Sequence, residues 1–283
     1  MSVTRSRTKI ALAVMGLVAS TGASAAVSLG NVVIGNSPCQ TWLGSTQLSS
    51  SSCSDANVAS ALQVGGGNVE LGKFGSGSGN TPPGTTLSGD FAGKPLTLRS
   101  LVEADWTTGR LQPTALTERY IQGAAQEAGI NLSPTGLSNA VTAFLSPNAG
   151  LGGMAPWMLV SDPNIDYVEM RDGHGVYIGL AGIYNATPFL QAVFGSQLPP
   201  GTLLPSGLQV SEVVHVDLAG LQDYLFGFEA TRSGVYAGPT PPSQQVQDTL
   251  SYSGTYEVKI PEPESLALLG LALVGAFIGR RRA

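Results

Sequence analysis

Two segments near the middle of the chain place apolar residues at helical spacing. Between residues 114 and 128 they recur every four positions, and Gly129 follows as a stop signal. In the second segment, residues 133–146, Ser133 suits the N-cap and Pro134 the first helical position. Together the segments predict a helical hairpin. The repeating apolar residues are Leu116, Tyr120, Ala124 and Ala128 in the first segment and Leu137, Val141, Phe144 and Leu145 in the second.

After Pro156 the pattern changes to short apolar runs bounded by turn residues, which predicts strands. The run Asp172-Gly173-His174-Gly175 joins two of these strands as a hairpin, because both glycines tolerate a positive φ. Hairpins that follow a group of helices favour an α+β fold, with the helical hairpin packed on an antiparallel sheet. The expected strands are residues 157–160, 165–171, 176–181, 208–218, 224–230 and 250–260.

The region before the helices, residues 26–89, is dominated by Gly, Ser, Asn and Thr. This composition predicts loops around short strands, such as residues 27–34. A phosphate-binding loop is disfavoured because the glycine-rich stretches lack a Gly-Lys-Ser/Thr ending and dinucleotide spacing. Between these glycines and the helices, Ser100-Leu101-Val102-Glu103 fits a capping box and predicts a helical turn.

Composition narrows the class of protein. The 283 residues are 42% hydrophobic and only 12% charged, which argues against disorder. The formal net charge is −5, and six of the cations lie in the first ten and last four residues, so the segment between them is more acidic still. Such a body repels phosphate backbones, and nucleic acid is not an expected partner.

Residues 1–25 have the three parts of a secretory signal peptide. Arg5, Arg7 and Lys9 precede an apolar stretch, and small residues lead to an expected cut by signal peptidase after Ala25. The alternative of a membrane anchor is disfavoured by the short apolar length. Twin-arginine export is also disfavoured, since Ser6 separates the two arginines.

The expected export indicates whether the two cysteines are paired or free. Oxidising compartments favour pairing, so Cys39 and Cys53 are expected to form one disulfide. Closing a loop of this size stabilises the fold by about 3 kcal/mol in the chain-entropy model. A reactive thiol is the alternative, but the local sequence lacks the basic or histidine neighbour that it needs.

The last 23 residues combine a strand breaker, a short apolar segment and a basic stop. Pro261-Glu262-Pro263 is followed by an uncharged run from Leu266 to Ile278 and then by Arg280, Arg281 and Arg282. As a helix the run is about 20 Å long, which falls short of a bilayer, so membrane association is expected to be temporary. The arginines are expected to stay in the cytoplasm and leave the body outside.

This order of elements resembles the PEP-CTERM sorting signal of exported bacterial proteins. The resemblance covers only the tail, and it implies recognition of Pro261, Glu262 and Pro263 by an exosortase, a membrane-embedded cysteine transpeptidase. It further implies that the apolar run is a transient anchor and that Arg280 to Arg282 are the membrane stop. The setting that it implies is an envelope of Gram-negative type, often in organisms that make exopolysaccharide.

Catalytic motifs are weak in the body. His215 and Asp217 alternate onto one face of an expected strand, which is half of a hydrolytic triad, and His174 lies in a turn. A serine nucleophile needs a Gly-x-Ser-x-Gly elbow, and the glycine-rich stretch at residues 75–79 has glycine where that serine belongs. We therefore expect no enzymatic activity, with a secreted hydrolase of polysaccharide or peptide as the alternative.

One acidic cluster has ligand-like spacing. Asp162, Asn164 and Asp166 can point three oxygens at a calcium ion, as in a calcium-stabilised adhesin. Tyr167 and Gly173 depart from the EF-hand loop at both diagnostic positions, so an Asp-Pro turn leading into a strand is favoured. No other cofactor is expected. A glycosidase that uses Asp162 or Glu169 is left open, because carboxylate separation is not visible in a sequence.

Tyrosines provide a further surface. Tyr252 and Tyr256 share one face of an expected strand, and Tyr167 and Tyr177 lie across the hairpin. Exposed aromatic rings can stack on sugars, although most such residues belong to the core. Exopolysaccharide is therefore a possible partner.

These features predict three parts: a signal peptide at residues 1–25, a secreted α+β domain at residues 26–260 and a sorting signal at residues 261–283. Within the domain, residues 26–95 form the strand and loop region and residues 96–260 hold the helical hairpin and later strands. The predicted function is that of an exported, non-enzymatic protein of the cell envelope or of a biofilm-type extracellular matrix, held briefly in the membrane by its tail.

Overall fold

A computed structural model describes residues 27–44, 46–50, 52–63, 67–72, 84–91, 93–170, 175–198, 201, 203–233 and 253–260. The expected signal peptide, the sorting tail, His174, Gly173 and Tyr252 lie outside the described residues.

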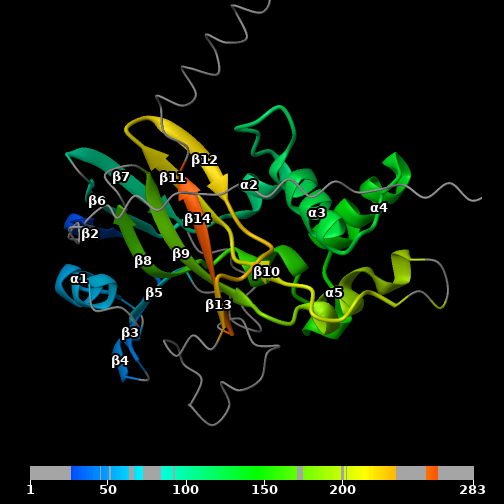
Figure 1. Cartoon of the computed structure of the whole chain (residues 1–283), viewed down its shortest axis with the longest axis horizontal. Helices are drawn as coiled ribbons and strands as arrows, with labels where there is room; N and C mark the ends of the chain where they lie inside the picture. The colour runs from blue at the N-terminus through cyan, green and yellow to red at the C-terminus, as the bar shows by residue number, and fades with distance from the viewer. Residues whose placement is uncertain are drawn as a thin grey trace, which may run out of the picture.

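Two antiparallel sheets form the body of the described chain; helices α2 to α5 gather to one side of them, and α1 lies on the other side (Figure 1). The larger sheet has the order β13-β14-β9-β8-β5-β3-β4, with β1 added to β8 and β10 to β9; the smaller has the order β12-β11-β7-β6-β2. The strands are β1 Val27–Ser28, β2 Gly30–Gly35, β3 Cys39–Leu43, β4 Thr46–Ser49, β5 Gly67–Leu71, β6 Thr86–Phe91, β7 Lys94–Arg99, β8 Asn164–Met170, β9 Val176–Ile183, β10 Val210–Ser211, β11 Val214–Leu218, β12 Leu221–Leu225, β13 Arg232–Ser233 and β14 Gly254–Ile260.

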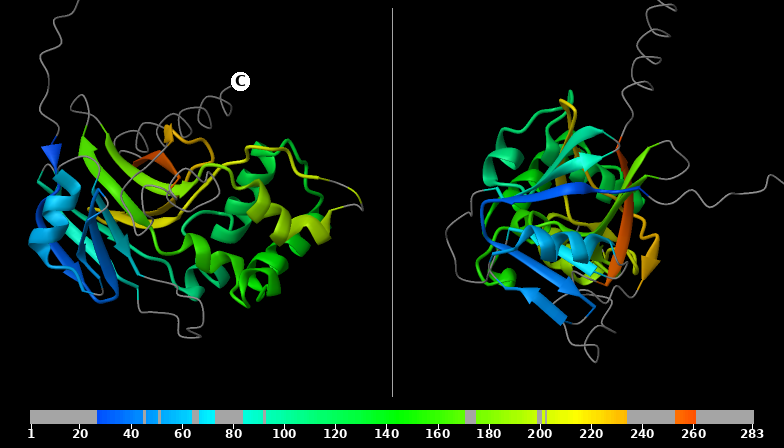
Figure 2. Two further views of the ribbon diagram at one scale, coloured as in Figure 1. Left: turned by 90° about the horizontal axis from the view of Figure 1, so that it is seen from below. Right: turned by 90° about the vertical axis from the view of Figure 1, so that its left-hand side faces the viewer.

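The main core lies between the apolar faces of the two sheets. Strand alternation sends Val69, Ile178 and Val258 of the larger sheet toward Leu98 and Val216 of the smaller one. Helix α1, Asp55–Gln63, packs against strands of both sheets (Figure 2). Its Val58 and Leu62 are buried in the same core.

The predicted helical hairpin is confirmed. Helices α3, Leu116–Glu127, and α4, Pro134–Leu145, match the expected segments, and the Ser133 hydroxyl accepts a hydrogen bond from the Gly136 amide as an N-cap. The hairpin packs against α2, Glu103–Thr107, α5, Thr187–Phe194, and the 3₁₀ segment η2, Pro156–Val160, rather than across a sheet face. A second core forms there around Trp106, Tyr120 and Phe144.

Several strand assignments were wrong. Residues 157–160 form η2, because Pro156 opens a 3₁₀ turn that buries Trp157 and Val160. The strand expected at residues 208–218 is two strands in different sheets, since the chain crosses from β10 to β11 at Glu212 and Val213. The region expected to hold only loops and short strands contains α1.

Other expected strands were confirmed with shifted bounds. Strands β8 and β9 pair as the predicted hairpin, and β14 covers the last part of the run at residues 250–260. The strand expected at residues 224–230 was correct only at Tyr224 and Leu225: β12 ends at Leu225 and starts earlier, at Leu221, because Ala219 and Gly220 turn the chain back on β11 with positive φ.

Candidate functional site

Strand β14 carries the described chain to the edge of the sorting tail. Its pairing with β9 continues through Lys259 and Tyr177 to Ile260 and Val176. Ile260 is 4% exposed and belongs to the main core. Pro261 follows it directly in the sequence, so the expected recognition motif begins where the folded body ends.

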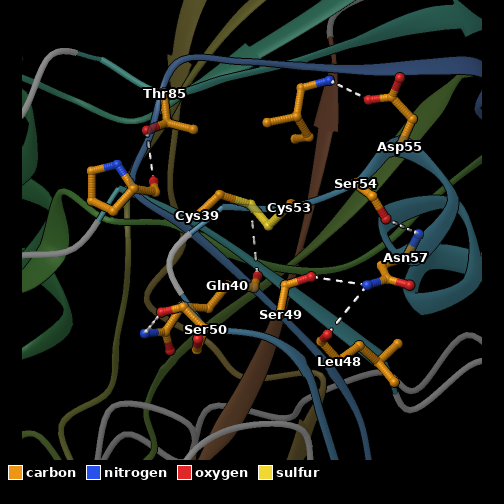
Figure 3. Close-up of a disulfide and its surroundings, with 12 residues drawn as sticks. Cys39, Gln40, Leu48, Ser49, Ser50, Cys53, Ser54, Asp55, Asn57 and Thr85 are labelled. Atoms are coloured by element: carbon orange, nitrogen blue, oxygen red, sulfur yellow. Dashed lines mark hydrogen bonds between the residues drawn. A yellow bond between two sulfur atoms is a disulfide. The ribbon is translucent and has the colours of Figure 1, made fainter.

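The predicted disulfide is present and fastens α1 to the larger sheet (Figure 3). It joins Cys39 of β3 to Cys53, two residues before α1, across a Cα separation of 5.6 Å. Around it, the Asn57 side-chain amide donates to the Leu48 carbonyl at 3.2 Å, and Asp55 accepts the Ile34 amide at 3.0 Å. The serine-rich loop is thus held at both ends by covalent and hydrogen bonds.

Asn164, one of the calcium candidates, faces a buried carboxylate that the sequence did not indicate. Its backbone amide donates to Glu212 Oε2 at 2.6 Å, and its side-chain Nδ2 lies 3.1 and 3.2 Å from the two carboxylate oxygens. Glu212 is 3% exposed at the crossover between the sheets. Burial and the nearby carboxylates of Asp162 and Glu70 raise the pKa of Glu212 well above its ordinary value.

The other two calcium candidates have different neighbours. The Asp162 carbonyl accepts the Asn164 side-chain amide at 3.2 Å, whereas Asp166 accepts the Thr255 hydroxyl at 2.6 Å. Within the described residues, no group of three or more His, Cys, Asp or Glu side chains is arranged to hold a metal ion. A calcium site at Asp162, Asn164 and Asp166 stays a prediction.

His215 and Asp217 lie on one face of β11, as predicted, but each belongs to a different local structure. The His215 ring packs edge-on against Tyr224, with centroids 5.2 Å apart, and burial together with Arg99 lowers its pKa. The Asp217 carboxylate accepts the Gly220 amide and the Gln222 side chain, both at 2.8 Å. Asp217 therefore fixes the turn between β11 and β12.

A buried ion pair beside His215 was missed by the sequence analysis. Arg99 donates to both oxygens of Asp105, at 2.7 and 2.8 Å, and the Tyr224 hydroxyl and the Val102 amide add bonds of 2.8 Å each. Burial raises the pKa of Asp105, but the bonds from Arg99 and Val102 outweigh it and leave the pKa below its ordinary value. This network joins β7, α2 and β12, and we name it the Asp105 network.

The tyrosine surface is only partly formed. Tyr256 is completely buried and donates to the Ile183 carbonyl at 2.7 Å, so it belongs to the core and cannot stack on a sugar. The Tyr167 hydroxyl donates to Glu257 at 2.9 Å, and Lys259 lies 5.6 Å from the centre of the Tyr177 ring. Tyr167 and Tyr177 remain half-buried on the face that β14 also lines.

An apolar cavity of about 80 Å³ lies between α3, α4 and α5. Its wall carries no charged side chain, so it is suited to a small apolar group rather than to polar catalysis. A second hollow beside it, which shares Ala125, Ile130 and Leu132, is lined by the amides of Gln122, Gln126 and Asn131. Residues of the apolar wall include Ile121, Ala140, Leu190, Phe194, Leu204 and Leu208.

Comparison with known families confirms the predicted sorting signal in the tail. Residues 259–282 match the family model of the PEP-CTERM protein-sorting motif. No curated protein and no solved structure matches the chain. In the part of the chain that the structure describes, no helix is long and apolar enough to cross a membrane. The matched segment begins at Lys259, inside β14, and so overlaps the folded body by two residues.

Proposed function

We propose that this chain is an extracellular protein delivered by an exosortase-type system and that its body serves as a non-catalytic component of the cell envelope or matrix. The observation that carries the proposal is the sorting motif at residues 259–282. It suggests export followed by recognition at the membrane by an exosortase. The role of the body in the envelope or matrix is proposed in addition and does not follow from the motif.

The use of polar groups in the body supports a structural or binding role. Three acidic side chains of the described body have internal partners: Asp217 holds a turn, Asp105 holds a helix to two strands, and Glu212 receives the amides of Asn164. Buried polar groups with such partners make the fold rigid, and this role needs no substrate. Half-buried Tyr167 and Tyr177 provide the surface on which contact with exopolysaccharide is proposed.

The experiment that tests this function is fractionation of the producing cells with and without the exosortase gene. We expect the body in the medium or matrix of the complete strain and in the membrane fraction of the deletion strain. Replacing Pro261, Glu262 and Pro263 by alanine should reproduce the deletion phenotype. Alanine at Leu203, an exposed residue far along the chain from the motif, is the matched control and should leave the distribution unchanged. Release into the matrix in both strains would contradict the proposal.

A further inference from the structure

One row of paired residues crosses four strands at one end of the larger sheet. Val27 pairs with Met170, Met170 with Val176, and Val176 with Ile260. Val27 is the first residue of β1 and Ile260 is the last residue of β14. The described chain therefore enters and leaves the body in the same row, which we name the tether end.

The spacing of strands sets the distance along this row. Neighbouring strands lie about 4.8 Å apart, so three steps place Val27 and Ile260 about 14 Å from each other. The expected signal peptide ends at Ala25, two residues before Val27, and the sorting motif extends past Ile260. The expected signal peptide and the sorting motif are therefore joined to the body at one small area of its surface.

The length of chain beyond Ile260 limits how far this area can lie from the membrane. Only five residues, Pro261 to Ser265, separate Ile260 from the apolar run that begins at Leu266. Fully extended, the six steps between those residues reach about 20 Å. Two of the five are prolines, which lack an amide donor and cannot extend the pairing of β14.

The body cannot lengthen this connection by releasing β14. The strand is paired with β9 along its whole length and buries Tyr256, Val258 and Ile260 in the core. Peeling off the strand would expose these three side chains to water, which is unfavourable for apolar area. An enzyme that reads the sorting motif therefore meets the tail within this limited reach of the folded sheet.

Resting on the proposed function, we propose that the exosortase-type enzyme docks against the tether end of the larger sheet and acts on the tail C-terminal to Ile260, with β14 intact. The side chains beside the row are then part of the contact surface. Tyr177 and Glu169 lie one position inside it, paired with each other and with Lys259 and Ser28.

The opposite end of β9 is a suitable reference surface. Strand β9 runs from Val176 at the tether end to Ile183, which leads into α5. Leu203, which follows α5, is 80% exposed, and Asn139 is exposed on α4. In the proposed complex these two residues lie on the part of the body that faces away from the enzyme.

The test is photo-crosslinking in cells that make the full chain. Benzoylphenylalanine is placed at Tyr177 or Glu169 and, as matched controls, at Leu203 or Asn139. A catalytically inactive exosortase is co-expressed to hold the uncut substrate. We expect crosslinks to the exosortase from Tyr177 and Glu169 and none above background from the controls.

Equal crosslinking from Leu203 or Asn139 would overturn the docking surface, as would its absence from both Tyr177 and Glu169. Tail processing is measured in parallel in cells with active exosortase. If the tail is processed but the crosslinks contradict the pattern, only the docking surface fails. If the tail is never processed, the proposed function and the docking surface fail together.

Discussion

Replacing Asp105 by alanine should be among the most damaging single changes in the described part of the domain. The carboxylate accepts four hydrogen bonds of 2.7 to 2.8 Å, two from Arg99 and one each from Val102 and Tyr224. The Asp105→Ala variant leaves a guanidinium, an amide and a hydroxyl without their acceptor. It also frees α2 from β7 and β12.

The magnitude follows from burial. Removing one partner of a fully buried ion pair costs about 3–5 kcal/mol. The side chain of Asp105 is 9% exposed and that of Arg99 24%, so water can reach the arginine in part. We therefore expect the lower end of that range, a loss of about 3 kcal/mol in the free energy of unfolding, or about 6–12 °C in Tm for a domain of this size.

A second aspartate–arginine pair in the same domain serves as the control. Asp223 makes one 3.1 Å contact with Arg119, and their side chains are 20% and 24% exposed. Asp223→Ala should cost no more than about 1 kcal/mol. Urea unfolding of the exported protein, followed by circular dichroism, measures both variants. Equal losses for Asp105→Ala and Asp223→Ala would refute the reasoning.

The pH dependence gives an independent check on Asp105. Its pKa in the folded protein is below the ordinary value of 3.8. The stabilisation is therefore complete above the unfolded pKa and is lost as the pH falls through the folded pKa. Stability of the wild-type protein should drop more steeply below about pH 4 than that of the variant. Parallel curves for the two proteins would contradict this assignment.

Three further predictions concern other parts of the body. Replacing Cys39 and Cys53 together by alanine should lower the free energy of unfolding by about 3 kcal/mol, and reductant should then have no further effect in urea unfolding. The wild-type protein should lose stability as the pH rises above about 4.5, because the raised pKa of Glu212 makes the folded carboxyl release its proton at a higher pH than the unfolded one. Glu212→Gln should remove this loss, and identical pH profiles for the two proteins would contradict the assignment. Gly67→Ala should cost about 1–3 kcal/mol because its Cβ would collide with the backbone of α1, whereas Gly30→Ala, whose Cβ would make only an ordinary van der Waals contact with the Asp90 carbonyl, should be nearly neutral; equal Tm values would contradict the packing.

Local signals in the sequence predicted the elements whose determinants are local. The hairpin of α3 and α4 follows from apolar spacing, the Ser133 cap and Gly129, all within one or two turns of the helices they define. The disulfide follows from the expected compartment and a count of two cysteines. Helix α1 was missed because serines surround it, although the Ser54 hydroxyl accepts the Asn57 amide as a cap does.

The remaining features depend on contacts between distant parts of the chain. Residues 208–218 have an apolar side chain at every second position except Glu212, a pattern typical of one strand, and the structure divides them between two sheets at Glu212 and Val213. Alternation along β14 was recognised in the sequence, but contacts with β9 and the second sheet decide which face of the strand is buried, so the sequence left open that Tyr256 lies in the core. Asp105 and Tyr224 are 119 residues apart, a separation at which no pattern in the sequence joins them.

Intact mass spectrometry of the protein from cells with and without the exosortase gene tests the central claim most directly. The account predicts an exosortase-dependent species that has lost Arg280, Arg281 and Arg282, retains Ile260 and is two mass units lighter before reduction of Cys39 and Cys53. A species of the same mass in both strains, with the arginines retained, would contradict the claim that this chain is sorted through its tail.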